Sequence, residues 1–77
     1  MGHRTWQNRI ETDPQVLRGK PCIKGTRVPV ALILGYLAAG RTSHQIIEQF
    51  PDLAAADIAS ALEYARDLAD FEVVGTA

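Results

Sequence analysis

The segment Gly19-Lys20-Pro21-Cys22-Ile23-Lys24-Gly25-Thr26-Arg27-Val28-Pro29-Val30 decides the fold, because it separates an extended N-terminal part of the chain from a helical remainder. Its two prolines each fix φ and lack an N–H group, so the segment cannot be the interior of a helix. Val28 precedes a proline and is biased toward an extended conformation, and Gly25 suits a turn. We therefore predict a stiff, cationic arm that folds back once and leads into a helix.

The arm is expected to contain two short strands. Residues 9–12 alternate polar and apolar side chains, which favours a strand that ends at the Asp13-Pro14 turn. Residues 22–24 can form a second strand, which pairs with the first or with another copy of the chain. The β arm is thus expected over residues 10–28. It follows a flexible, polar segment over residues 1–9, in which Trp6 docks on the core or on a second chain.

The rest of the chain has the pattern of three helices, expected over residues 29–39, 43–49 and 55–70. Pro29 suits the first position of the first helix, and Gly40 suits the residue that closes it. Thr42 and Gln45 match a capping box at the start of the second helix. In the third helix, apolar residues recur at three- and four-residue steps, which indicates one buried stripe.

The first helix is nearly apolar all round, which predicts that more than one of its faces is buried. Gly35 lies in its middle, where glycine costs about 1 kcal/mol relative to alanine, so a close helix–helix approach is expected there. One face would pack on the chain's own core and another on a second subunit. A core of this size is marginal alone, so we expect a homodimer or a higher homo-oligomer.

The 77 residues are expected to form a single domain over residues 10–70, followed by a C-terminal tail over residues 71–77. The single cysteine excludes an intramolecular disulfide and a four-cysteine zinc site. No apolar run approaches the roughly 20 residues that span a bilayer. No apolar signal core follows the first four residues either, so we expect a cytoplasmic protein without a membrane segment.

The sequence offers no pattern of a catalytic or cofactor site. Lys20 is followed by Pro21 and not by the Ser or Thr of a phosphate-binding loop. His3 and His44 are isolated, and Cys22 is expected to be a small buried hydrophobe. No acidic pair, nucleophile or base stands out. We therefore predict no enzymatic activity, no metal and no cofactor.

The charges are divided between the two halves of the chain. Residues 1–41 contain seven basic and two acidic residues, whereas residues 42–77 contain one basic and seven acidic residues. The halves either attract each other, within or between chains, or the basic half meets an anionic partner. For Arg27 a structural ion pair with Asp57 or Glu63 is a further interpretation. The residues expected to contact nucleic acid or a protein partner are Arg18, Lys20, Lys24, Arg27 and Arg41.

A longer pattern runs through residues 10–65: Ile10-x-x-Asp13-Pro14, Gly19-Lys20-Pro21-x-Ile23-x-Gly25-Thr26-Arg27-x-Pro29-Val30, Gly40, Ile46, Phe50-Pro51-x-Leu53, Asp57-Ile58 and Ala61-Leu62-x-Tyr64-Ala65. It resembles the small bacterial proteins of the domain-of-unknown-function 433 family. The resemblance implies a homeodomain-like helix-turn-helix bundle after a short β arm. It also implies an antitoxin of a VapBC-type pair, whose partner is a PIN-like nuclease. The residues with a structural part in this motif are Gly19, Pro21, Gly25, Thr26, Pro29, Gly40 and Pro51.

The third helix departs from the family pattern at its start. Ala54-Ala55-Ala56 stands where the family usually has a Thr or Ser cap, and loss of such a cap costs about 1 kcal/mol. Two compensations are open: Asp52 caps the helix one turn earlier, or Asp57 offsets part of this loss near the positive end of the helix. None of these residues pairs with bases as Arg, Asn or Gln would. We therefore expect an interaction module, with a DNA-binding regulator that contacts phosphates as the alternative.

Overall fold

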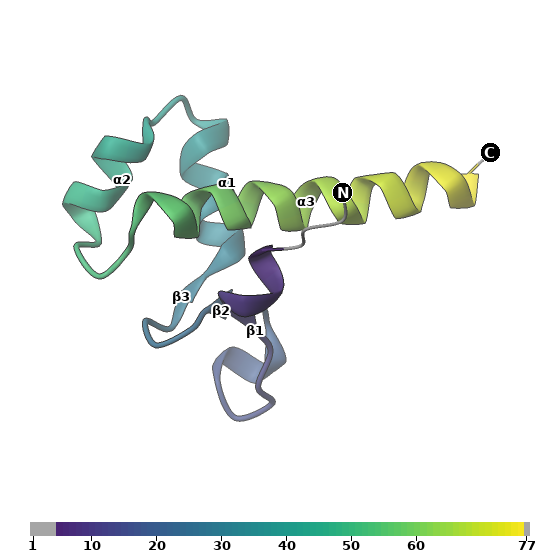
Figure 1. The fold of residues 1–77 in the computed structure, drawn as a ribbon, viewed down its shortest axis with the longest axis horizontal. Coiled ribbons are helices and arrows are strands. Elements are labelled where there is room, and N and C mark those ends of the chain that lie inside the picture. Colours follow the sequence, from purple (N-terminus) through teal and green to yellow (C-terminus); the bar gives the residue numbers. More distant parts are fainter. Residues whose placement is uncertain (1–4, 77) are drawn as a thin grey trace.

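The computed structural model of the protein describes the backbone of residues 5–76 and the side chains of residues 6–70. Three short strands and two 3-10 helices precede three α-helices (Figure 1). In chain order the elements are η1 (Thr5–Asn8), β1 (Ile10–Glu11), η2 (Leu17–Gly19), β2 (Cys22–Ile23), β3 (Val28–Pro29), α1 (Val30–Ala38), α2 (Ser43–Gln49) and α3 (Ala55–Thr76).

The arm is a three-stranded antiparallel sheet in the order β1-β2-β3. Its pairs are Ile10↔Ile23, Glu11↔Cys22, Cys22↔Pro29 and Ile23↔Val28. The two strands expected from the sequence are present, but the third was not predicted. Pro29 has no N–H group for the ladder, and it is accommodated because β3 lies at an edge of the sheet.

The first helix begins one residue later than expected. Pro29 keeps an extended ψ of 142° and is the N-cap, so its predicted place as the first helical residue is wrong. The reason is its pairing with β2, which continues into a hydrogen bond from the Val30 N–H to the Pro21 carbonyl at 3.0 Å. The predicted end is confirmed, because Gly40 has a φ of +92° and closes α1.

Local capping explains the starts of the other two helices. In α2 the predicted box is present: the Gln45 N–H donates to Thr42 Oγ1 at 3.1 Å, and the Thr42 N–H donates to Gln45 Oε1 at 2.9 Å. In α3, Asp57 Oδ2 accepts a hydrogen bond from the Ala54 N–H at 2.8 Å. Asp57 therefore does reach back over the first turn and replaces part of the missing cap.

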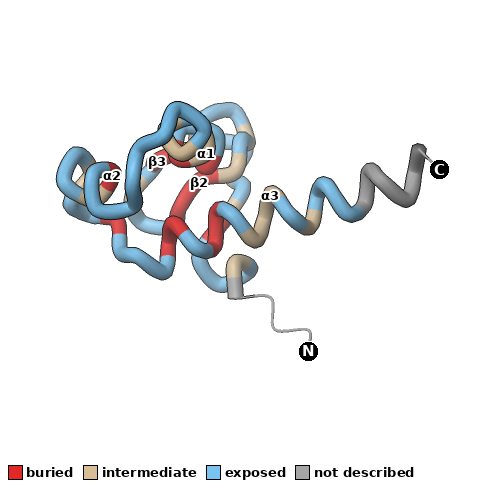
Figure 2. The backbone as a smooth tube through the Cα atoms, turned by 90° about the horizontal axis from the view of Figure 1, so that it is seen from above, coloured by how far each residue is buried: buried red, intermediate tan, exposed pale blue. Residues whose placement is uncertain are grey.

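The hydrophobic core lies between the sheet, α1, α2 and the first half of α3 (Figure 2). Buried positions of α3 end at Ala61, and beyond this residue the described positions are half-buried or exposed. The helix itself continues to Thr76, through most of the segment that the sequence set apart as a tail. The fully buried side chains include Ile23, Val30, Ile33, Ile46 and Ile58.

In the N-terminal segment, Trp6 packs on the chain's own core, which is one of the two places expected for it from the sequence. Trp6 Nε1 donates a hydrogen bond to Asp67 Oδ2 at 2.6 Å. The Trp6 ring meets Tyr64 edge-on, with ring centroids 5.0 Å apart. A half-buried aromatic contact and a satisfied indole N–H thus hold η1 in place. Residues 1–4 lie outside the described part.

Within residues 5–76, no helix is both long and apolar enough to cross a membrane.

Candidate interaction surface

The β2–β3 turn presents two of the predicted contact residues. Lys24 and Arg27 are exposed on it, and neither has an ion pair among the described side chains. Thr26 fixes the turn, because its Oγ1 donates to the Ile23 carbonyl at 2.9 Å and accepts from the Val28 N–H at 3.0 Å. Gly25 and Arg27 have φ values of +79° and +60°. We call Lys24–Arg27 the cationic tip.

The structural ion pair considered for Arg27 is made by another arginine. Arg9 Nη1 lies 3.0 Å from Asp57 Oδ1, and the Asp57 side chain is 9% exposed. The Arg27 side chain stays in solvent because it leaves the turn from the left-handed region of the backbone. Sequence reasoning missed Arg9, since its partner is 48 positions away and no local signal joins them.

A second surface forms around η2, where three consecutive residues have a positive φ: Leu17 (52°), Arg18 (58°) and Gly19 (82°). Only Gly19 adopts this conformation without cost, so Leu17 and Arg18 are strained by roughly 1–2 kcal/mol each. Hydrogen bonds from the Gly19 N–H to the Val16 carbonyl and from the Lys20 N–H to the Leu17 carbonyl hold the turn. Leu17 is 40% exposed on this turn, although it is a large apolar side chain.

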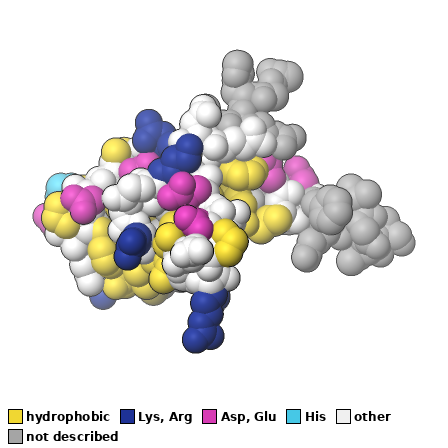
Figure 3. All heavy atoms as spheres, turned by 90° about the horizontal axis from the view of Figure 1, so that it is seen from below, with side chains coloured by type: hydrophobic (Ala, Val, Ile, Leu, Met, Phe, Trp, Pro, Cys, Tyr) yellow, Lys and Arg dark blue, Asp and Glu magenta, His cyan; other side chains and the backbone are white. Residues whose placement is uncertain are grey.

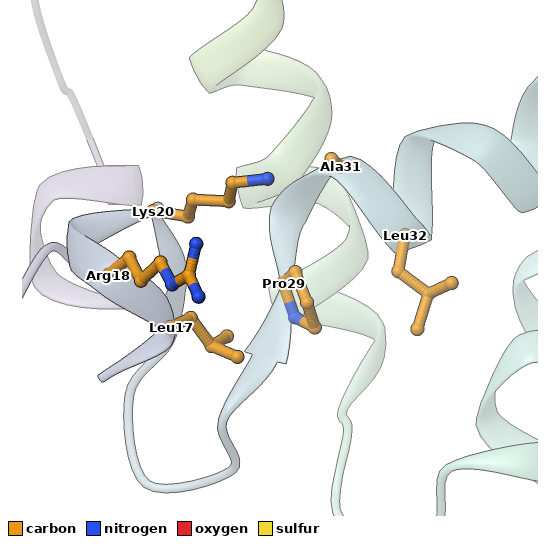
Figure 4. Close-up of a pocket in the computed structure, with 6 residues that line it drawn as sticks. All are labelled: Leu17, Arg18, Lys20, Pro29, Ala31 and Leu32. Carbon is orange, nitrogen blue, oxygen red and sulfur yellow. The ribbon is translucent and has the colours of Figure 1, made fainter.

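A groove of about 610 Å³ lies between η2 and the start of α1 (Figure 4). Leu17, Arg18 and Lys20 stand on one side, Leu32 on the other, and Pro29 between them. The groove therefore has an apolar lining with two cations at one wall. Among described side chains, these two cations have no ion pair. The complete lining is Leu17, Arg18, Lys20, Pro29, Ala31 and Leu32.

The outward face of α1 continues from this groove. Its exposed residues are Ala31, Leu32, Gly35 and Ala38, which are all apolar or lack a side chain. A Cβ atom added at Gly35 would meet nothing within 4 Å. The described residues of this chain therefore do not make the close helix–helix approach expected at Gly35.

The five predicted contact residues do not form one patch. Arg18 and Lys20 line the groove, Lys24 and Arg27 form the cationic tip, and Arg41 follows the closing residue of α1. In Figure 3 basic side chains stand at separate places on the visible face, with hydrophobic atoms between them. Recognition of a partner would therefore use separate cationic points beside apolar surface.

The start of α3 is occupied by internal contacts. Asp57 is buried and is bound both by the Ala54 N–H and by Arg9, while Ala54, Ala55 and Ala56 are exposed. The exposed residues of this turn have no side-chain donor or acceptor for a base edge. Within residues 6–70, no group of three or more His, Cys, Asp or Glu side chains has the geometry to hold a metal ion.

The elements define a small, mainly α domain with an N-terminal β arm, and the predicted fold class is thereby confirmed. The chain belongs to the family described as "Protein of unknown function (DUF433)", whose model matches residues 10–65. This match confirms the resemblance found in the sequence.

Two relatives support the same assignment. A DUF433 member from Anabaena variabilis, known from a crystal structure, superposes with a TM-score of 0.73 and 28% identity over 92% of this chain and 73% of that chain. "Uncharacterized protein y4eO" of Sinorhizobium fredii is 38% identical over 57 residues, which are 74% of this chain and 26% of the relative. The chain thus spans about a quarter of that relative's length.

Proposed function

We propose that this chain is a non-enzymatic interaction module that acts as the antitoxin-type partner of a PIN-like nuclease. The observation that carries this proposal is the cationic tip, where Lys24 and Arg27 stand exposed on a turn held by both hydrogen bonds of Thr26. A metal-dependent nuclease binds its ions through carboxylates. A projecting pair of cations is complementary to such an acidic site and would mask it.

The turn is also suited to this task because it is already ordered. Lys24 and Arg27 are placed by the hairpin itself, and so the backbone loses little freedom when a partner binds. A flexible loop that carried the same two basic side chains would lose more backbone freedom on binding. The tip is therefore the part of the molecule that we expect to enter the partner's site.

The proposal expects a PIN-like nuclease gene beside the gene of this chain, and it is tested with the product of that gene. The two proteins are co-expressed, and cleavage of an RNA substrate by the nuclease is measured with increasing amounts of this chain. We expect co-purification and inhibition by the wild type, and a loss of at least about tenfold in inhibition for K24E/R27E. The R18E/K20E variant has the same change in net charge as K24E/R27E, but at the groove, and it should still inhibit the nuclease. Nuclease activity that is unchanged by excess wild-type chain would overturn the proposal.

A stand-alone DNA-binding regulator remains the second candidate, because α2 and α3, joined by residues 50–54, have the chain order of a helix-turn-helix. The exposed cations would contact phosphates, whereas the alanines at the start of α3 offer nothing to base edges. A gel shift with the gene's own promoter region at several salt concentrations tests it. This candidate predicts binding that weakens steeply with salt and is reduced in the K20A/K24A/R27A variant.

A further inference from the structure

The last described turn of α3 lies outside the body of the molecule (Figures 1 and 2). Leu68, Ala69 and Asp70 are all exposed, and Leu68 is 50% exposed. Successive residues of a helix are about 100° apart, so these three cover roughly 200° of its circumference. Among the described residues, none buries these three side chains. Helices in proteins owe most of their stability to a packed apolar face, and the described side chains provide no such packing for this turn.

The groove between η2 and α1 is a mostly apolar hollow in the surface. Leu17 and Leu32 are 40% and 38% exposed at its two sides. Arg18 and Lys20 add positive charge at the η2 wall, and Pro29 lies between the two walls (Figure 4). A volume of about 610 Å³ is within the range of protein sites that enclose a ligand.

We propose that this groove binds residues 68–70 of α3 from a second copy of the chain. Ala69, the smallest of the three exposed side chains, would face Pro29 between the two walls. Leu68 and Asp70 then point to opposite sides, because each is about 100° from Ala69 around the helix. Leu68 meets Leu32 on the α1 wall, and Asp70 meets the two cations on the η2 wall.

The charges of the chain favour a second copy over an unrelated protein. The half that forms the groove has an excess of basic residues, and the half that contains α3 has an excess of acidic residues. Each copy has one groove and one such turn of α3. Two copies related by a two-fold axis can therefore bind each other reciprocally through these turns, and the assembly closes as a dimer. This exchange covers both unpartnered features at once and enlarges the small core.

The dimer is tested by sedimentation equilibrium of the full chain over a range of concentrations. We expect a dimer for the wild type. R18E/K20E and, separately, D70K should each raise the dimer dissociation constant by at least about tenfold. The combined R18E/K20E/D70K variant again has opposite charges on the groove and on residue 70. It should recover most of the lost affinity between the two copies. The matched control is K24E/R27E, which makes the same charge change at the cationic tip and should leave the dimer intact.

Circular dichroism of each variant shows whether the monomer still folds, so loss of the dimer is separated from loss of the fold. A monomeric wild type would overturn the proposal. So would a dimer that withstands both R18E/K20E and D70K, because the interface would then lie elsewhere. Failure of the combined variant to regain affinity would overturn the pairing of Asp70 with Arg18 and Lys20. The dimer and the proposed inhibition of a nuclease can fail independently. The dimer is tested at Arg18, Lys20 and Asp70 without any nuclease present, whereas inhibition is tested at Lys24 and Arg27.

Discussion

Arg9 and Asp57 form an ion pair in which Arg9 Nη1 and Asp57 Oδ1 are 3.0 Å apart. The pair joins the residue just before β1 to the first turn of α3, although the two residues are 48 positions apart in the chain. The other oxygen of the same carboxylate accepts the Ala54 N–H. One buried side chain therefore caps a helix and fixes the β arm to it.

Replacing Asp57 should be more destabilising than replacing Arg9. Asp57→Ala removes both the cap and the ion pair, and we expect a loss of about 2 kcal/mol in the free energy of unfolding. Arg9→Ala should cost less, since the Arg9 side chain is 44% exposed and its ion pair is screened by solvent. Urea unfolding followed by circular dichroism measures both losses. Equal losses for the two variants would show that the cap contributes nothing.

Thr26 should be essential to the shape of the cationic tip. Thr26→Val keeps the branched side chain but removes both hydrogen bonds of Oγ1, and we expect a loss of about 1–2 kcal/mol in the free energy of unfolding. Thr26→Ser keeps the hydroxyl and is the matched control. Urea titrations of the two variants provide the comparison. A Thr26→Val variant as stable as wild type would mean that the turn is held by its backbone alone.

The elements that were predicted correctly are those specified by neighbouring residues. The box of Thr42 and Gln45 and the closing Gly40 each depend on residues within one turn of helix, and the structure has both. The exposed cations of residues 24–27 follow from a turn that Gly25 marks in the sequence. Such signals act over a few residues, so the sequence displays them directly.

The features that could not be predicted join distant parts of the chain. Trp6 meets Asp67 across 61 positions, and Arg9, not Arg27, pairs with Asp57. The groove likewise needs Leu17 and Leu32 on facing elements, and the positive φ of Leu17 has no signal in its residue type. Each contact depends on how the arm folds over the helices, which a pattern along the sequence does not contain.

Gly35 and Gly40 should respond to alanine in opposite ways. Gly35 lies inside α1 with nothing within 4 Å of an added Cβ atom, so Gly35→Ala should raise the free energy of unfolding by about 1 kcal/mol. Gly40 has a φ of +92°, and Gly40→Ala should lower that free energy by about 1 kcal/mol because of backbone strain. Thermal or urea unfolding distinguishes the two. Destabilisation by Gly35→Ala would indicate that α1 is approached closely there by another molecule.

Cys22 should make the stability fall at high pH. Burial, together with the carboxylate of Glu11 opposite it in the sheet, raises the pKa of the Cys22 thiol above its usual value of 9.0. The unfolded chain therefore loses this proton at a lower pH than the folded chain does. The thiol's contribution to stability is complete below pH 9.0 and is lost as the pH rises through the folded-state pKa. Urea midpoints measured from pH 7 upward should decline less in Cys22→Ala than in wild type, whereas parallel declines would contradict the assignment to this thiol.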